Sequence, residues 1–275
     1  MKRMAILIAS PTVNLNGFLP KTAQGAINSI VYWNYYLKTP KLGAWIDDEE
    51  IQYRSDWNKE SLIEFIQSLK GYDYIFFVYC GHGARFPKDG CESPTSEDDF
   101  EDCILLDDGH QIVRVEDIRN EIGQATRKAT MLIDACRGHV WDIQESGTLL
   151  KRPLPPLNES LNEWRNKWID EFGKYDLNEI VLVQSCSPGE KAYMTPYDCD
   201  FSVFAKKIFK SIDDVPYSMN VGELYNRVAP SVNSIANAYY NEDQQPVCSH
   251  ESEQVKYPFI ITNGLEIAGQ LAKEQ

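Results

Sequence analysis

The sequence predicts an α/β fold in which a mostly parallel sheet is covered by helices on both faces. Three segments carry this prediction: the apolar runs at residues 4–9 and 129–135, and the aromatic, β-branched run at residues 73–80. Predominantly apolar segments of this length are typical of strands that are buried on both faces. Because segments with helical periodicity separate them, we expect parallel strands joined by helical crossovers.

Helical segments lie between these strands in the order that such a fold requires. Residues 22–38 carry apolar side chains at helical spacing, and Pro40 ends the segment. Asn58 is suited to cap a second helix, because apolar residues after it recur at i, i+3, i+4 and i+7 until Gly71. Residues 115–123 predict a third helix.

The rest of the chain completes a sheet of about six strands. A hairpin is expected at residues 103–106 and 111–113, which flank the turn-forming sequence Asp-Asp-Gly-His. Prolines, followed by apolar residues three and four apart, predict a loop with an inserted amphipathic helix within residues 141–177. The remaining expected elements are strands at 179–186 and 257–262 and helices at 201–212 and 221–240, the last with a break near Pro230.

The composition excludes several classes of protein. The chain has 275 residues, 43% of them hydrophobic, and a formal net charge of -14. These values favour a globular domain with a large core over a disordered chain. The acidic excess argues against nucleic-acid partners, and no apolar run has the length of a membrane span or a signal-peptide core. The seven cysteines follow no regular spacing, so we expect free thiols and a cytoplasmic location.

Two reactive side chains follow two of the predicted strands. His82 lies between two glycines just after the strand at 73–80, and Cys136 comes directly after the run that ends at Ala135. Because ligands of parallel sheets bind beyond the carboxyl ends of the strands, both residues are expected to face one crevice. A cysteine nucleophile needs a nearby base, and the N–H groups of Gly83 and Cys136 are suited to bind an oxyanion. The alternative is that each residue is an ordinary part of the core.

The sequences around these two residues resemble a known family. Ala135-Cys136-Arg137-Gly138 is similar to the caspase signature, with a histidine element, Tyr79-Cys80-Gly81-His82-Gly83, about 50 residues upstream. The preceding Asp134 resembles the pattern of metacaspases and bacterial caspase-like peptidases. The resemblance implies a caspase-like fold in one domain, residues 1–275. Within it, residues 1–140 resemble the large subunit, 141–178 an inserted linker, and 179–275 the small subunit.

The resemblance also implies a reaction. Cys136 attacks the scissile carbonyl of a protein substrate, Gly83 helps to hold the oxyanion, and His82 protonates the leaving amine before water hydrolyses the acyl-enzyme. This chemistry requires no cofactor, and an activator protein acting in trans is possible. A catalytically silent caspase-fold scaffold is the alternative function. A zinc site made of Cys80, His82, Cys136 and His139 is disfavoured, because only one residue separates Cys80 from His82, whereas structural zinc sites usually have about two to four residues between paired ligands.

Asp134 is the candidate specificity residue. It lies two positions before Cys136, so in an extended chain the two side chains share a face. A carboxylate there is suited to bind a substrate arginine or lysine, with Cys80 as a second residue of the pocket. Metacaspases usually supply a second pocket acid in the helix after the first strand, and in this sequence Gly25 stands at the matching place. The alternative role for Asp134 is a hydrogen bond to a loop backbone.

Two further expectations concern regulation. An acidic run supplies oxygen ligands suited to Ca²⁺, and several metacaspases are calcium-activated, so the run is a candidate calcium site. Its candidate ligands are Asp98, Asp99, Asp102, Asp107 and Asp108. The linker contains Lys151 and Arg152, so an enzyme of basic specificity is able to cut itself there. Because Pro153 follows Arg152, the expected position is the Lys151–Arg152 bond or a later basic site. The alternatives are an ordinary solvated loop and an uncut linker.

Overall fold

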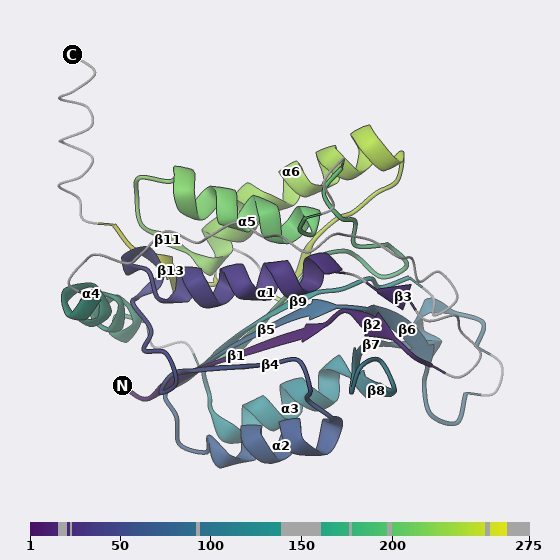
Figure 1. Ribbon diagram of the computed structural model, residues 1–275, viewed down its shortest axis with the longest axis horizontal. Helices are drawn as coiled ribbons and strands as arrows, with labels where there is room; N and C mark the ends of the chain where they lie inside the picture. Colours follow the sequence, from purple (N-terminus) through teal and green to yellow (C-terminus); the bar gives the residue numbers. More distant parts are fainter. Residues whose placement is uncertain are drawn as a thin grey trace.

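The computed structural model has a central six-stranded sheet with strand order β12-β10-β9-β5-β1-β4 (Figure 1). It describes residues 1–15, 21–22, 24–91, 94–138, 161–175, 178–196, 200–250 and 254–262. The strands of the central sheet are β1 (Arg3–Ser10), β4 (Ile51–Arg54), β5 (Tyr74–Gly81), β9 (Ala129–Asp134), β10 (Ile180–Gln184) and β12 (Val247–Cys248). All neighbours pair in parallel except β12, which runs antiparallel to β10. The predicted mostly parallel sheet is therefore confirmed.

Helices cover both faces of this sheet, as predicted (Figure 1). One face packs against α1 (Gln24–Leu37), α5 (Val203–Asp214) and α6 (Val221–Tyr240), and the other against α2 (Lys59–Ser68) and α3 (Val115–Ala125). The strand side chains alternate between the two cores, as a pleated sheet requires. Leu7 and Phe76 belong to the first core, whereas Ile6 and Phe77 belong to the second.

Three small sheets and two short 3₁₀ helices surround the central sheet. They are β2 (Thr12–Val13) with β3 (Lys21–Thr22), β6 (Gly83–Pro87) with β7 (Phe100–Leu106) and β8 (Gln111–Arg114), β11 (Met219–Asn220) with β13 (Pro258–Ile260), and the helices η1 (Pro40–Leu42) and η2 (Glu97–Asp99). β7 and β8 form the predicted hairpin, in which Leu106 faces Gln111 across the turn. The Asn58 cap is also confirmed, because its side chain accepts a hydrogen bond from the N–H of Ser61 at 2.8 Å.

One expectation about the C-terminal part was wrong. Helix α6 runs without interruption through Pro230, whose ring removes one backbone donor but does not end the helix, because the helix is packed on both sides of it through Leu224 and Ala236. The strand expected at residues 257–262 is confirmed as β13, which pairs with β11 outside the central sheet. The central sheet is instead completed by β4 and β12, which are too short and too exposed to leave a clear sequence pattern.

The predicted inserted helix is α4 (Leu161–Gly173), which lies near the amino ends of β1 and β5 (Figure 1). Its Trp168 packs so closely on Gly43 that a Cβ there would lie 2.5 Å from the indole. Arg165 forms an ion pair with Glu50, a residue that also binds the buried Arg3. These contacts place α4 at the end of the sheet opposite to the carboxyl ends of the strands. None of the described helices combines the length and the hydropathy needed to cross a membrane.

Candidate active site

The two strands that precede His82 and Cys136 are direct neighbours. β5 ends at Gly81 and β9 ends at Asp134, and Cys80 faces Asp134 in the parallel register. Residues that follow these strands therefore leave the sheet at the same edge. The structure thus brings together the histidine and cysteine motifs that the sequence separates by 54 positions.

Gly83 is the point where the two motifs touch. A Cβ on Gly83 would lie 2.8 Å from the Cβ of Ala135 and 2.9 Å from the carbonyl oxygen of Cys136. Real Cβ atoms do not approach other atoms this closely, so a side chain at this position would force the motifs apart. The glycine is required here because of close packing between the two backbones.

The backbone of His82 is held by three hydrogen bonds from three different elements. Its N–H donates to Ser10 O at 3.1 Å, and its carbonyl accepts from the Tyr79 hydroxyl at 2.6 Å and from Leu105 N–H at 3.2 Å. His82 is 5% exposed, so these bonds lie in a buried setting. Burial also raises the pKa of Tyr79, which keeps this hydroxyl protonated and able to donate.

Cys136 is half-buried and lies against a segment that follows β10. The Ala192 N–H donates to Cys136 Sγ at 3.3 Å. The next residue, Arg137, is bonded to the same loop in two places: its N–H donates to Glu190 O, and its carbonyl accepts from Gly189 N–H, both at 2.9 Å. The cysteine is therefore placed by β9 on one side and by residues 189–192 on the other.

A buried charge network next to Cys136 was not found from the sequence. Arg137 donates to both carboxylate oxygens of Asp102, at 3.0 and 2.6 Å, and to Cys186 O at 3.0 Å. Arg85 reaches the same carboxylate at 3.4 Å. The sequence signal was one arginine in the cysteine motif and another two residues after the histidine motif. Their partner on β7 depends on how the β6–β7–β8 sheet folds back to the site.

The structure does not bring the predicted calcium ligands together. Asp102 is engaged by the two arginines, and the Asp99 carboxylate accepts from the N–H groups of Thr95 and Ser96, both at 2.8 Å. Asp98, Asp107 and Asp108 are exposed. In the part of the chain that the structure describes, no three histidine, cysteine or acidic side chains form a group arranged to hold a metal ion. Cys80, His82 and Cys136 of the disfavoured zinc site therefore form no such group either, and its fourth residue, His139, lies outside the described residues.

Asp134 is buried at the end of β9 on the face covered by α5. The Ser202 hydroxyl, at the N-cap of that helix, donates to its Oδ2. Its Oδ1 accepts no hydrogen bond from the described residues, since the nearby Ser185 hydroxyl donates to Ala135 O. Burial raises the pKa of Asp134 to about 6, and the hydrogen bond from Ser202 acts against this rise. The carboxylate is thus a buried charge with an oxygen still able to accept.

Cys80 lies beside Asp134 but is part of the core. It is 1% exposed and packs with the residues under α1. Burial, with a smaller effect of the Asp134 charge, raises the pKa of this thiol well above its ordinary value. Cys80 therefore stays a neutral thiol next to the candidate pocket acid. The candidate processing residues Lys151 and Arg152 lie outside the described residues.

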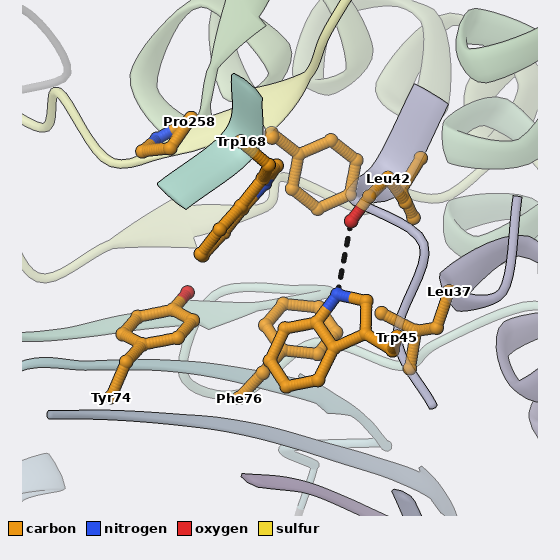
Figure 2. Close-up of a pocket in the computed structure, with 8 residues that line it drawn as sticks. Leu37, Leu42, Trp45, Tyr74, Phe76, Trp168 and Pro258 are labelled. Atoms are coloured by element: carbon orange, nitrogen blue, oxygen red, sulfur yellow. Dashed lines mark hydrogen bonds between the residues drawn. The ribbon is translucent and has the colours of Figure 1, made fainter. Parts of the chain in front are cut away.

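The apolar pocket of the molecule lies far from this site. Its lining includes Trp168 of α4 and Tyr74, the first residue of β5, which places it at the opposite end of the sheet, and Figure 2 shows Trp168 lying close to Tyr74. The Trp45 Nε1 there donates to Leu42 O at 2.9 Å, so its polar group is satisfied within the core. The void measures about 10 Å³ and has the size of a packing gap rather than a ligand site.

Comparisons with known proteins agree with the fold described above. A model of the caspase domain matches residues 50–257, which include His82, Cys136 and the loop that contacts them. No curated protein matches the sequence. The crystal structure of caspase-1 from Spodoptera frugiperda is similar with a TM-score of 0.56 at 13% sequence identity, covering 95% of this chain and 89% of that chain. At this identity the likeness shows a common fold. Because the family model spans most of the sequence, the chain belongs to the caspase-domain family of peptidases.

Proposed function

We propose that this protein is a cysteine endopeptidase that cleaves protein substrates with Cys136 as nucleophile and His82 as its acid–base partner. The close packing of Gly83 against the Cys136 backbone is the observation that carries the proposal. It supports a single site at the carboxyl ends of β5 and β9, where parallel sheets bind their ligands. A cysteine at this edge is also half-exposed, as a nucleophile must be.

In the proposed reaction, His82 accepts the thiol proton and the Cys136 sulfur attacks the carbonyl carbon of the scissile bond. The N–H groups of Gly83 and Cys136 bind the resulting oxyanion, a type of contact whose loss typically costs about 3 kcal/mol of transition-state stabilisation. Collapse of this intermediate breaks the C–N bond, and His82 delivers the proton to the leaving amine. Water then attacks the acyl-enzyme and releases the carboxylic acid product together with free Cys136.

We further propose that the enzyme cleaves after arginine or lysine. The buried Asp134 carboxylate, two residues before the nucleophile, supports this specificity, because one of its oxygens is free to accept a hydrogen bond. A guanidinium or ammonium group bound to Asp134 would offset the effect of burial, which raises the pKa of this carboxyl. The alternative role, a hydrogen bond to a loop backbone, has less support, since the carboxylate accepts from the Ser202 side chain.

A panel of fluorogenic peptides that differ only at the residue before the cleaved bond tests this proposal. We expect turnover of arginine and lysine peptides, its loss in Cys136→Ala, and full activity in Cys248→Ala, a matched variant at another half-buried cysteine. Faster cleavage after aspartate or apolar residues would refute the basic specificity. A folded wild-type protein that cleaves no peptide, with or without Ca²⁺ or a candidate activator, would favour the silent scaffold instead.

A further inference from the structure

Gln244 has no role in the reaction proposed above, yet it is completely buried near the site. Its exposure is 0%, which is unusual for a glutamine and requires partners for its amide group. The Nε2 group donates to Ser185 O at 3.0 Å, and Oε1 accepts from Tyr193 N–H at 3.1 Å. The side-chain amide therefore closes the loop between Ser185 and Tyr193 in the way that a backbone peptide group of a neighbouring strand would.

Both ends of this bridge are joined to the reacting residues. At one end, Ser185 N–H donates to Ile133 O of β9, and the Ser185 hydroxyl donates to Ala135 O, next to the nucleophile. At the other end, Ala192, which precedes Tyr193, donates its N–H to Cys136 Sγ. The Gln244 side chain thus joins the Ala192 segment to the end of β9, in addition to the backbone bonds of Arg137 to Gly189 and Glu190.

The bridge is itself held in one place. Gln244 N–H donates to the Asn233 side chain of α6 at 3.1 Å. The following residue, Gln245, donates its N–H to the Glu190 carboxylate at 2.7 Å and accepts at its carbonyl from the Ser187 hydroxyl at 3.0 Å. These bonds tie residues 244–245 both to α6 and to the loop that contacts Cys136.

We infer that Gln244 is a positioning residue of the proposed protease: its amide holds the Ala192 N–H against Cys136 Sγ and so keeps the nucleophile in one orientation. The inference rests on the proposed function only for its kinetic consequences. Nucleophiles need such support, because a misplacement of about 1 Å can lower a rate by roughly 100-fold. The role differs from that of His82, since Gln244 acts through backbone groups and not on the substrate.

Two substitutions separate positioning from mere stability. Gln244→Ala removes both contacts, and we expect kcat for an arginine peptide to fall roughly 10- to 100-fold with KM nearly unchanged.

The second substitution, Gln244→Glu, keeps the size and shape of the side chain. Its neutral carboxyl can still donate to Ser185 O, whereas the ionised form directs a negative oxygen at that carbonyl. Activity of Gln244→Glu should therefore be close to wild type at low pH and fall as the introduced carboxyl ionises. Glu190 from the loop, with Glu242 and Asp243 on its own segment, disfavours ionisation and moves this fall to higher pH.

The matched control is Gln245→Glu. It makes the same change one residue later, on an exposed side chain whose backbone bonds remain. Its pH profile should follow that of the wild type. The inference is overturned if folded Gln244→Ala keeps kcat within about twofold, if only its KM changes, or if Gln244→Glu and Gln245→Glu share one pH profile. If Gln244→Ala fails to fold, the comparison of the pH profiles of Gln244→Glu and Gln245→Glu tests the inference by itself.

A second measurement distinguishes failure of this inference from failure of the proposed function. The rate of Cys136 alkylation by iodoacetamide, followed by mass spectrometry, requires no peptide cleavage. We expect it to fall roughly threefold or more in Gln244→Ala, because an N–H donor at the sulfur favours the reactive thiolate. An inactive wild type with this slower alkylation would refute the protease but retain the positioning role. An unchanged alkylation rate would refute the positioning role whatever the peptide assay shows.

Discussion

Replacing Asp134 with asparagine tests whether the protein carries a buried charge for function at a cost in stability. The substitution keeps the size of the side chain and an oxygen that can accept from the Ser202 hydroxyl. It removes the ionisable group. We expect the variant to be more stable than the wild type at pH 8, and to lose cleavage after arginine and lysine.

The magnitude follows from the two pKa values of this carboxyl. It is about 6 in the folded protein, against an ordinary value of 3.8. Between these values the folded state holds the proton more tightly than the unfolded chain, so stability falls as pH rises through this window. Above pH 6 the full cost applies: a difference of about 2 units at 1.36 kcal/mol each gives about 3 kcal/mol. At pH 5 only about half of this cost is present.

The assay is urea unfolding of the wild type and Asp134→Asn at pH 5 and pH 8. Asp170→Asn is the control, because it removes an exposed carboxylate of α4 by the same chemical change. We expect Asp134→Asn to gain up to about 3 kcal/mol over the wild type at pH 8 and about half as much at pH 5. A variant that is no more stable than the wild type at pH 8, or a gain that does not change with pH, would refute the account of Asp134 as a costly buried charge.

Two further predictions concern the acidic segment around β7. Asp102→Asn should lower the free energy of unfolding by about 3 kcal/mol, because two buried arginines lose their shared carboxylate. The control Asp98→Asn changes an exposed carboxylate in the same segment and should have little effect. Equal urea midpoints for the two variants would contradict this prediction. Because Asp102 is bonded to arginines, Asp99 to backbone N–H groups, and the described side chains of the acidic run form no metal-holding group, we also expect neither EGTA nor added Ca²⁺ to change the rate of peptide cleavage. A rate that EGTA lowers and added Ca²⁺ restores would show that the acidic run binds calcium after all.

The local pattern of the sequence determined much of the fold. The buried strands at the centre of the sheet, the capped helix after Asn58 and the inserted helix α4 all have strong periodicity or a capping residue, and such signals act within a few residues of chain. The edge strands β4 and β12 left no such signal. A short strand with one open side needs few apolar residues, so only its pairing with β1 or β10 identifies it.

The candidate site likewise has features that the sequence predicts and contacts that only the structure shows. By itself, the sequence determined which residues are suited to the chemistry: Cys136 and His82 each follow a strong strand signal, and the carboxyl edge of a parallel sheet is a predictable place. Only the tertiary structure decided what surrounds them. The partnership of Arg137 with Asp102 and the Gln244 bridge join residues that lie 35 to 59 positions apart. The position of a charged or amide side chain in the sequence follows no periodic pattern that would identify its partner. These contacts are therefore formed only when packing brings separate elements together.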